Sequence, residues 1–181
     1  MKKIISLITL FLFITSLNIA FAAPPPTEEQ VKSEFLTLVN KHLDGYTANP
    51  RIMVYNISGF ETQNVKDGWR KSKCVITGNF EYDIQQTDST DVPYTAHLIY
   101  KMFVLVSPPF LTKEDAEKTE TFIQYKQPHV YRITFSYQDG KWLPDKYESQ
   151  FQVERSLAPF WLPMEKSTLS SPYKRVVVIT N

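Results

Sequence analysis

The sequence has little of what stabilises or activates many small proteins. Its 181 residues include a single cysteine, Cys74, so no internal disulfide can form, and only five glycines, with no glycine-rich phosphate-binding loop. Basic and acidic residues nearly cancel, which leaves a formal net charge of +1. A near-neutral chain has no electrostatic basis for binding nucleic acid or an anionic membrane, so we expect neither partner.

Catalytic and metal-binding motifs are missing as well. The three histidines, His42, His97 and His129, have none of the spacings of zinc sites, and no nucleophile-elbow or Ser-x-x-Lys motif occurs. We therefore expect no metal and no cofactor. The remaining acid–base candidates are His42, on the apolar side of a predicted helix, and Asp83 with His97, on neighbouring predicted strands. Each histidine is more readily interpreted as a surface or hydrogen-bonded side chain.

The N-terminus carries the pattern of a secretory signal peptide. Lys2 and Lys3 precede an apolar run over residues 4–21, and Ala20-Phe21-Ala22 fits the small-x-small cleavage rule. We expect residues 1–22 to be removed, leaving a proline-rich leader at 23–26. A retained membrane anchor is the alternative, but the run is short and no stop-transfer cluster comes after it. The sequence thus predicts a secreted protein, in the bacterial periplasm, with no membrane span after cleavage.

Residues 27–43 predict the one long helix of the mature chain. Thr27 and Gln30 form a capping box, and apolar residues then recur at helical spacing. The stripe comprises Val31, Phe35, Leu38, Val39 and His42. Gly45 suits the left-handed residue that ends a helix.

Most of the chain after this helix alternates between apolar and polar residues as strands do. The predicted strands cover residues 51–58, 69–84, 92–107, 129–137 and 142–153, with a short edge strand at 122–125 and an exposed helical turn at 112–118. Gly78 within the second strand predicts a bulge, and Asp139-Gly140 predicts a tight hairpin. Cys74 alternates with apolar residues, which indicates a buried thiol. The tyrosines at positions 94, 100, 131, 137 and 147 either line a pocket or, the interpretation we favour, pack on the sheet.

One capped helix before long antiparallel strands resembles the cystatin-like and NTF2-like domains. The residues that carry the resemblance are 27–43, 69–84, 92–106 and the hairpin 137–142, Tyr-Gln-Asp-Gly-Lys-Trp. The resemblance implies an α+β fold with one N-terminal helix packed on a curved antiparallel sheet of about four to six strands. It covers a domain at 27–153 and includes no functional residue matched by motif. A single helix before the sheet favours the simpler cystatin-like layout.

The tail, residues 154–181, departs from the strand pattern. Phe160, Trp161 and Leu162 lie between two prolines, which disfavour a regular central strand. Exposed aromatic clusters mark partner sites, so we predict these three residues as partner-binding candidates. The run at 174–180 predicts a terminal strand, which can pair with a strand of a partner. The alternative is that the tail folds back as a lid and last strand of the domain.

These observations leave several functional classes open. We favour a non-catalytic binding or accessory module that engages another envelope protein or a small apolar ligand. The alternatives are a small enzyme or an apolar-ligand carrier that uses a cone-shaped cavity. Clustering of His42 or His97 with Asp83 at a solvent-reached pocket would favour the enzyme, and a large cavity without ionisable groups would favour the carrier.

Overall fold

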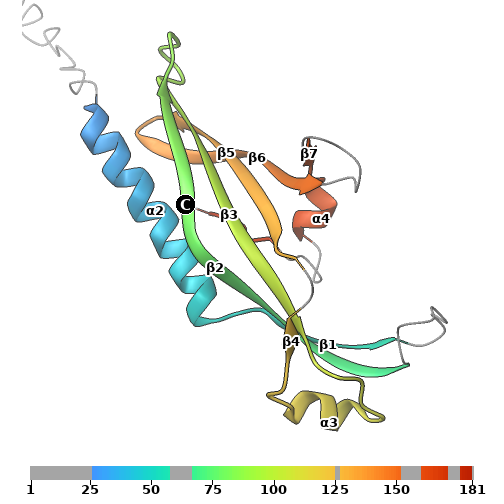
Figure 1. Ribbon diagram of the computed structural model, residues 1–181. Helices are drawn as coiled ribbons and strands as arrows, with labels where there is room; N and C mark the ends of the chain where they lie inside the picture. The colour runs from blue at the N-terminus through green and yellow to red at the C-terminus, as the bar shows by residue number, and fades with distance from the viewer. Residues whose placement is uncertain (1–25, 58–66, 125–126, 152–159, 171–175, 181) are drawn as a thin grey trace, which may run out of the picture.

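The protein is an α+β structure in which one long helix lies against a seven-stranded antiparallel sheet (Figure 1). A computed structural model describes residues 26–57, 67–124, 127–151, 160–170 and 176–180. The predicted signal peptide and all but the last residue of the leader lie outside these ranges, as does the proposed domain boundary after Val153. Within them, no helix has the length and apolar character needed to cross a membrane.

Helix α2 (Glu28–Ala48) begins as the sequence predicts and ends later. The Thr27 hydroxyl accepts from the Gln30 amide at 3.3 Å, while the Gln30 side chain donates to Glu34 instead of completing the capping box. The prediction that Gly45 ends the helix is wrong, because the helix continues to Ala48 and Gly45 has no left-handed backbone. The helix ends at Asn49, which precedes Pro50, because a proline disfavours helical backbone at the residue before it.

In the part of the chain that the structure describes, the sheet matches the predicted strands closely and has seven strands, more than the four to six expected. The strands are β1 (Ile52–Ile57), β2 (Gly68–Gln86), β3 (Tyr94–Val106), β4 (Ile123–Gln124), β5 (His129–Gln138), β6 (Lys141–Phe151) and β7 (Phe160–Pro163). Their order is β1-β2-β3-β5-β6-β7, with β4 paired to β3. The β5–β6 hairpin turns at Asp139 and Gly140, whose φ angles of 49° and 72° confirm the predicted tight turn.

The long strands β2 and β3 present two different faces. The inner face, which packs on α2, carries Cys74 and Leu98, both fully buried, so the predicted buried thiol is confirmed. The outer face carries His97 and, on β5, Arg132. The pairing slips between Thr77 and Glu81, which confirms the bulge predicted at Gly78. Because the slip leaves two extra residues on β2, alternation between the faces continues unchanged beyond it.

The core lies where the N-terminal half of α2 crosses the inner face. Phe35 is fully buried, with its ring centroid 5.3 Å from that of Phe135 and 5.1 Å from that of Trp142. The Trp142 indole N–H donates to the Val31 carbonyl at 2.9 Å. Aromatic packing together with one buried hydrogen bond thus fixes the helix on the β5–β6 hairpin.

A smaller group of elements gathers at the other end of β2 and β3 (Figure 1). There β1, β4 and the short helix α3 (Lys113–Lys118) lie together. Lys71 of β2 is buried, and its ammonium donates to the carbonyls of Glu117 and Thr119 and to the Glu120 carboxylate, at 2.8–3.0 Å. The cation thereby caps the C-terminal end of α3, where the helix dipole favours positive charge.

The described part of the tail packs on the domain. Strand β7 pairs with β6 at the edge of the sheet, as the prolines around it suggest, and a short helix, α4 (Lys166–Ser170), comes next. The predicted terminal strand is wrong for residues 176–180, which are assigned to no strand. Val176, Val177 and Ile179 are nevertheless buried, because this segment lies in the core.

Candidate functional site

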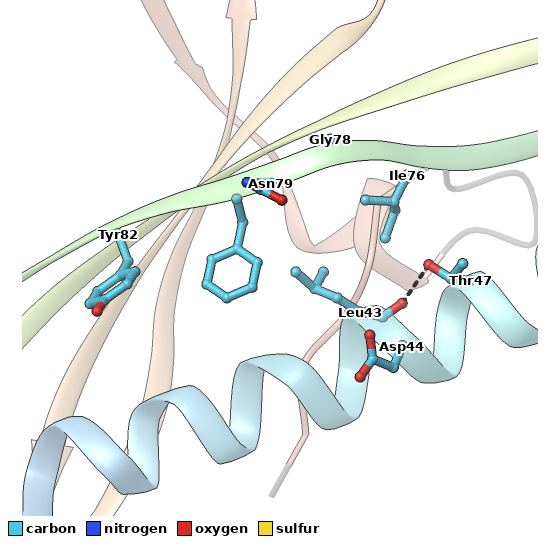
Figure 2. A pocket seen from close by; sticks show the side chains of 8 residues that line it. Leu43, Asp44, Thr47, Ile76, Gly78, Asn79 and Tyr82 are labelled. Atoms are coloured by element: carbon cyan, nitrogen blue, oxygen red, sulfur yellow. Dashed lines mark hydrogen bonds between the residues drawn. The ribbon is translucent and has the colours of Figure 1, made fainter.

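A pocket of about 540 Å³ opens between the C-terminal half of α2 and the bulged part of β2 (Figure 2). The helix lines it with Leu43, Asp44 and Thr47. The strand contributes Ile76, Gly78, Asn79, Phe80 and Tyr82. In Figure 2, Leu43 extends from the helix and Ile76 from the strand into the space between them, and the walls combine apolar side chains with a few polar groups, as ligand sites commonly do.

Beside this pocket, β2 has an unpaired edge. Strand β1 pairs with β2 only as far as Lys73, and the Cys74 amide makes the last contact, to the Arg51 carbonyl. From residue 75 to residue 86, apart from the slip at residues 78–80, β2 pairs with β3 on one side and with no described strand on the other. Unpaired backbone groups along such an edge can accept a further strand, and we refer to residues 75–86 as the β2 edge.

The charged side chains around the β2 edge are mainly acidic. Glu81 and Asp83 are exposed on the outer face, and Asp44 is exposed at the pocket. None of the three forms an ion pair with a described residue, although Asp83 accepts a hydrogen bond from Gln85 at 2.7 Å. Basic groups in this region include Lys32, 6.0 Å from the Tyr82 ring centroid, and Lys101, paired with Thr77.

The three predicted catalytic candidates do not meet in one site. Asp83 and His97 are direct cross-strand partners on the outer face, so the register brings their backbones together. Their side chains turn to other groups, since the His97 Nδ1 lies 3.1 Å from the Thr134 hydroxyl and no hydrogen bond joins it to Asp83 among the described residues. His42 lies on α2, where its Nδ1 is 2.9 Å from the Leu38 carbonyl.

The predicted partner-binding residues lie on the edge strand β7 and point in two directions. Phe160 and Leu162 are 43% and 41% exposed. Trp161 faces the other way and lies under Arg132, whose guanidinium carbon is 4.5 Å from the indole ring centroid. Arg132 also donates to the buried Glu148 carboxylate at 2.7 Å, and this hydrogen bond lowers the Glu148 pKa. Trp161 therefore covers a structural ion pair, and only Phe160 and Leu162 remain exposed.

The inner-face tyrosines pack on the sheet, as expected. Two of them also bind the C-terminal segment, which the sequence did not indicate. Tyr100 and Tyr147 are buried, and each hydroxyl accepts a backbone N–H of the C-terminal segment. Burial raises the pKa of both hydroxyls further above the ordinary tyrosine value. No short-range signal in the sequence links these tyrosines to a segment so distant along the chain.

Comparisons with known proteins identify no relative. No protein-family model matches the chain, and no curated protein or solved structure shows significant similarity to it. In the described part of the chain, no group of three or more His, Cys, Asp or Glu side chains is placed to hold a metal ion. The proposed function is therefore based on the pocket and the β2 edge.

Proposed function

We propose that this protein is an exported, non-catalytic binding module of the cell envelope, and that it binds an extended segment of a partner protein along the β2 edge. The export half of the proposal rests on the signal-peptide pattern of residues 1–22. The cystatin-like layout inferred from the sequence belongs to the same proposal. The binding half rests on one observation, which is that an unpaired strand edge runs beside an open pocket.

The geometry defines what an added strand would meet. A strand that pairs with β2 lies about 4.8 Å from it, and its side chains alternate between the two faces. Those on the inner side would approach Phe80, Tyr82 and the pocket below them. Those on the outer side would lie beside Glu81 and Asp83. Main-chain hydrogen bonds would supply affinity and the pocket would select the inner side chains, as in other cases of strand addition.

The charges along the β2 edge restrict which partner sequences can bind. Two exposed carboxylates on the outer face favour basic residues directly opposite, because cross-strand pairs of opposite charge stabilise a sheet and like charges destabilise it. The preferred partner is thus a segment that alternates apolar with Lys or Arg residues. Two copies of β2 paired with each other would bring acidic side chains together, so self-association at this edge is disfavoured.

The other two functional classes have less support. None of His42, Asp83 and His97 is among the residues that line the pocket, so an enzyme there would lack the acid–base pair predicted from the sequence. An apolar-ligand carrier has one observation in its favour, because the pocket volume lies in the range of small-molecule sites. Asp44 in the wall argues against a purely apolar ligand, since burying a carboxylate without a partner is costly.

The test is a titration of the mature protein with a short fluorescent peptide that alternates Lys and Val. We expect saturable binding that weakens with salt. The double variant Glu81→Lys/Asp83→Lys should weaken binding by about tenfold or more, because two attractive pairs become repulsive. Asp88→Lys/Asp91→Lys is the matched control, since it makes the same charge change at exposed loop positions and should bind nearly as the wild type does.

A second peptide separates strand addition from simple charge attraction. N-methylation at alternate residues keeps the side chains and removes the backbone donors that strand pairing needs. We expect this peptide to bind far more weakly than the unmodified one. Equal binding of the two peptides, or equal losses for the two double variants, would contradict the proposal. Saturable binding of an uncharged apolar molecule instead of the peptide would favour the carrier.

A further inference from the structure

The C-terminal segment, residues 176–180, is held in the way that proteins hold a bound peptide. It belongs to no helix or strand, and none of the backbone–backbone hydrogen bonds found among the described residues involves it. Val176, Val177 and Ile179 are at most 4% exposed, so its apolar side chains are inside the domain. In a regular strand these backbone groups would pair with a neighbouring strand, and here side chains replace that partner.

Three elements supply those side chains. The Val177 N–H donates to the Tyr100 hydroxyl of β3 at 3.0 Å, and the Ile179 N–H donates to the Tyr147 hydroxyl of β6 at 3.0 Å. The Tyr147 hydroxyl in turn donates to the Ile179 carbonyl at 3.4 Å. The Thr180 N–H donates to the Nε2 atom of His42 on α2 at 3.2 Å. We call Tyr100, Tyr147 and His42 the seat of the segment.

Two of the three seat residues also contact groups outside the segment. The Tyr100 ring stacks on Tyr131 with centroids 5.5 Å apart. The Nδ1 atom of His42 lies 2.9 Å from the Leu38 carbonyl, an acceptor, so Nδ1 carries the proton and Nε2 is free to accept. All four hydrogen bonds between the seat and the segment are to backbone atoms of the segment, so they do not select side-chain identity. Selection comes from the surrounding core, which accepts only apolar side chains.

We propose that the seat is a binding site for an extended, β-branched apolar peptide, and that residues 176–180 occupy it as an internal ligand. An empty seat would leave two buried tyrosine hydroxyls without their partners, which favours occupation by some chain segment. A separate peptide with the sequence of this segment would also fit the seat, because it presents the same backbone and side-chain groups. This site uses different residues from the β2 edge, so the two proposals stand or fall separately.

The test uses the full chain with a specific protease site inserted between Pro172 and Tyr173, outside the described residues. The protein is folded, cut, and mixed with a fluorescent peptide of residues 173–181. We expect the cut protein to keep its circular dichroism spectrum and to exchange its own fragment for the peptide at one site. A peptide with Ile179→Asp should bind at least about 100-fold more weakly, because it would bury a charge without a partner. A peptide with Thr180→Ala should bind as the native one does, because that side chain is exposed and its N–H remains.

Two protein variants test the seat itself. Tyr147→Phe keeps the ring and removes the hydroxyl that contacts Ile179, so peptide affinity should fall by about tenfold. Tyr55→Phe makes the same change on β1 and should leave affinity unchanged. Equal affinity for both variants, or a cut protein that never exchanges its fragment, would overturn the proposal.

If cutting the chain unfolds the protein, hydrogen exchange of the uncut chain tests the same proposal. If the segment is an internal ligand, the amides of Val177 and Ile179 should exchange through a local release, faster than those of Leu98 and Ile133 in the central strands. Exchange of all four amides at the rate of global unfolding would show that the segment is a permanent part of the core, and the proposal would fail.

Discussion

Truncation of Phe35 to alanine tests how α2 is held on the sheet. The side chain is fully buried and contacts three aromatic rings, those of Tyr82, Phe135 and Trp142, at centroid distances of 5.1–6.0 Å. Replacing a buried Phe by Ala costs about 3–5 kcal/mol, from lost transfer free energy and the cavity left behind. Lost edge-to-face contacts add to that cost, so we expect the upper half of this range. Urea denaturation monitored by tryptophan fluorescence measures the change.

Thr37→Ala is the matched control on the same helix. Thr37 is exposed, and its hydroxyl donates only to the Ser33 carbonyl within the helix, at 2.8 Å. Alanine is the better helix former, so the free energy of unfolding should change by less than about 1 kcal/mol. Similar losses for the two variants, or a loss below about 1.5 kcal/mol for Phe35→Ala, would refute the inference that this stripe of α2 closes the core.

Two further predictions concern the N-terminus and the outer face. N-terminal sequencing of the protein from its native envelope should begin at Ala23, and an intact Met1 on a membrane-bound protein would contradict export. Glu148→Gln should destabilise the protein by about 1–3 kcal/mol at neutral pH, because it removes the carboxylate that Arg132 and Lys146 contact. The Glu148 pKa is lowered in the folded state, so its contribution is complete above the unfolded value of 4.5 and is lost as the pH falls through the folded pKa. Denaturation curves should therefore converge for wild type and variant in acid, and a constant difference would contradict this interpretation.

Local features were predictable from the sequence because their causes are local. The N-cap at Thr27, the bulge at Gly78 and the turn at Asp139-Gly140 each depend on the backbone preferences of one or two residues. The strands were predictable because one buried face imposes alternation. Gly45 shows the limit of this reasoning, since a glycine permits a helix to end but does not require it when the next residues can continue the helix.

The candidate sites depend on contacts between distant segments, which no local pattern encodes. The C-terminal run has high strand propensity, yet its backbone groups bind Tyr100, Tyr147 and His42 instead of a strand. Tertiary context therefore overrode propensity. Asp83 and His97 illustrate the same point, because their register became known only from the pairing of β2 with β3, and their side chains then proved to contact other residues.

Amide hydrogen exchange of the mature protein, measured with and without the Lys–Val peptide, shows whether the β2 edge accepts a strand. In an antiparallel sheet, alternate residues of an edge strand point their N–H groups away from the neighbouring strand. Among residues 75–86, we therefore predict that the peptide slows exchange at every second amide, those not already bonded to β3. Unchanged exchange along this edge, or protection that appears at β7 instead, would show that the peptide does not add to β2.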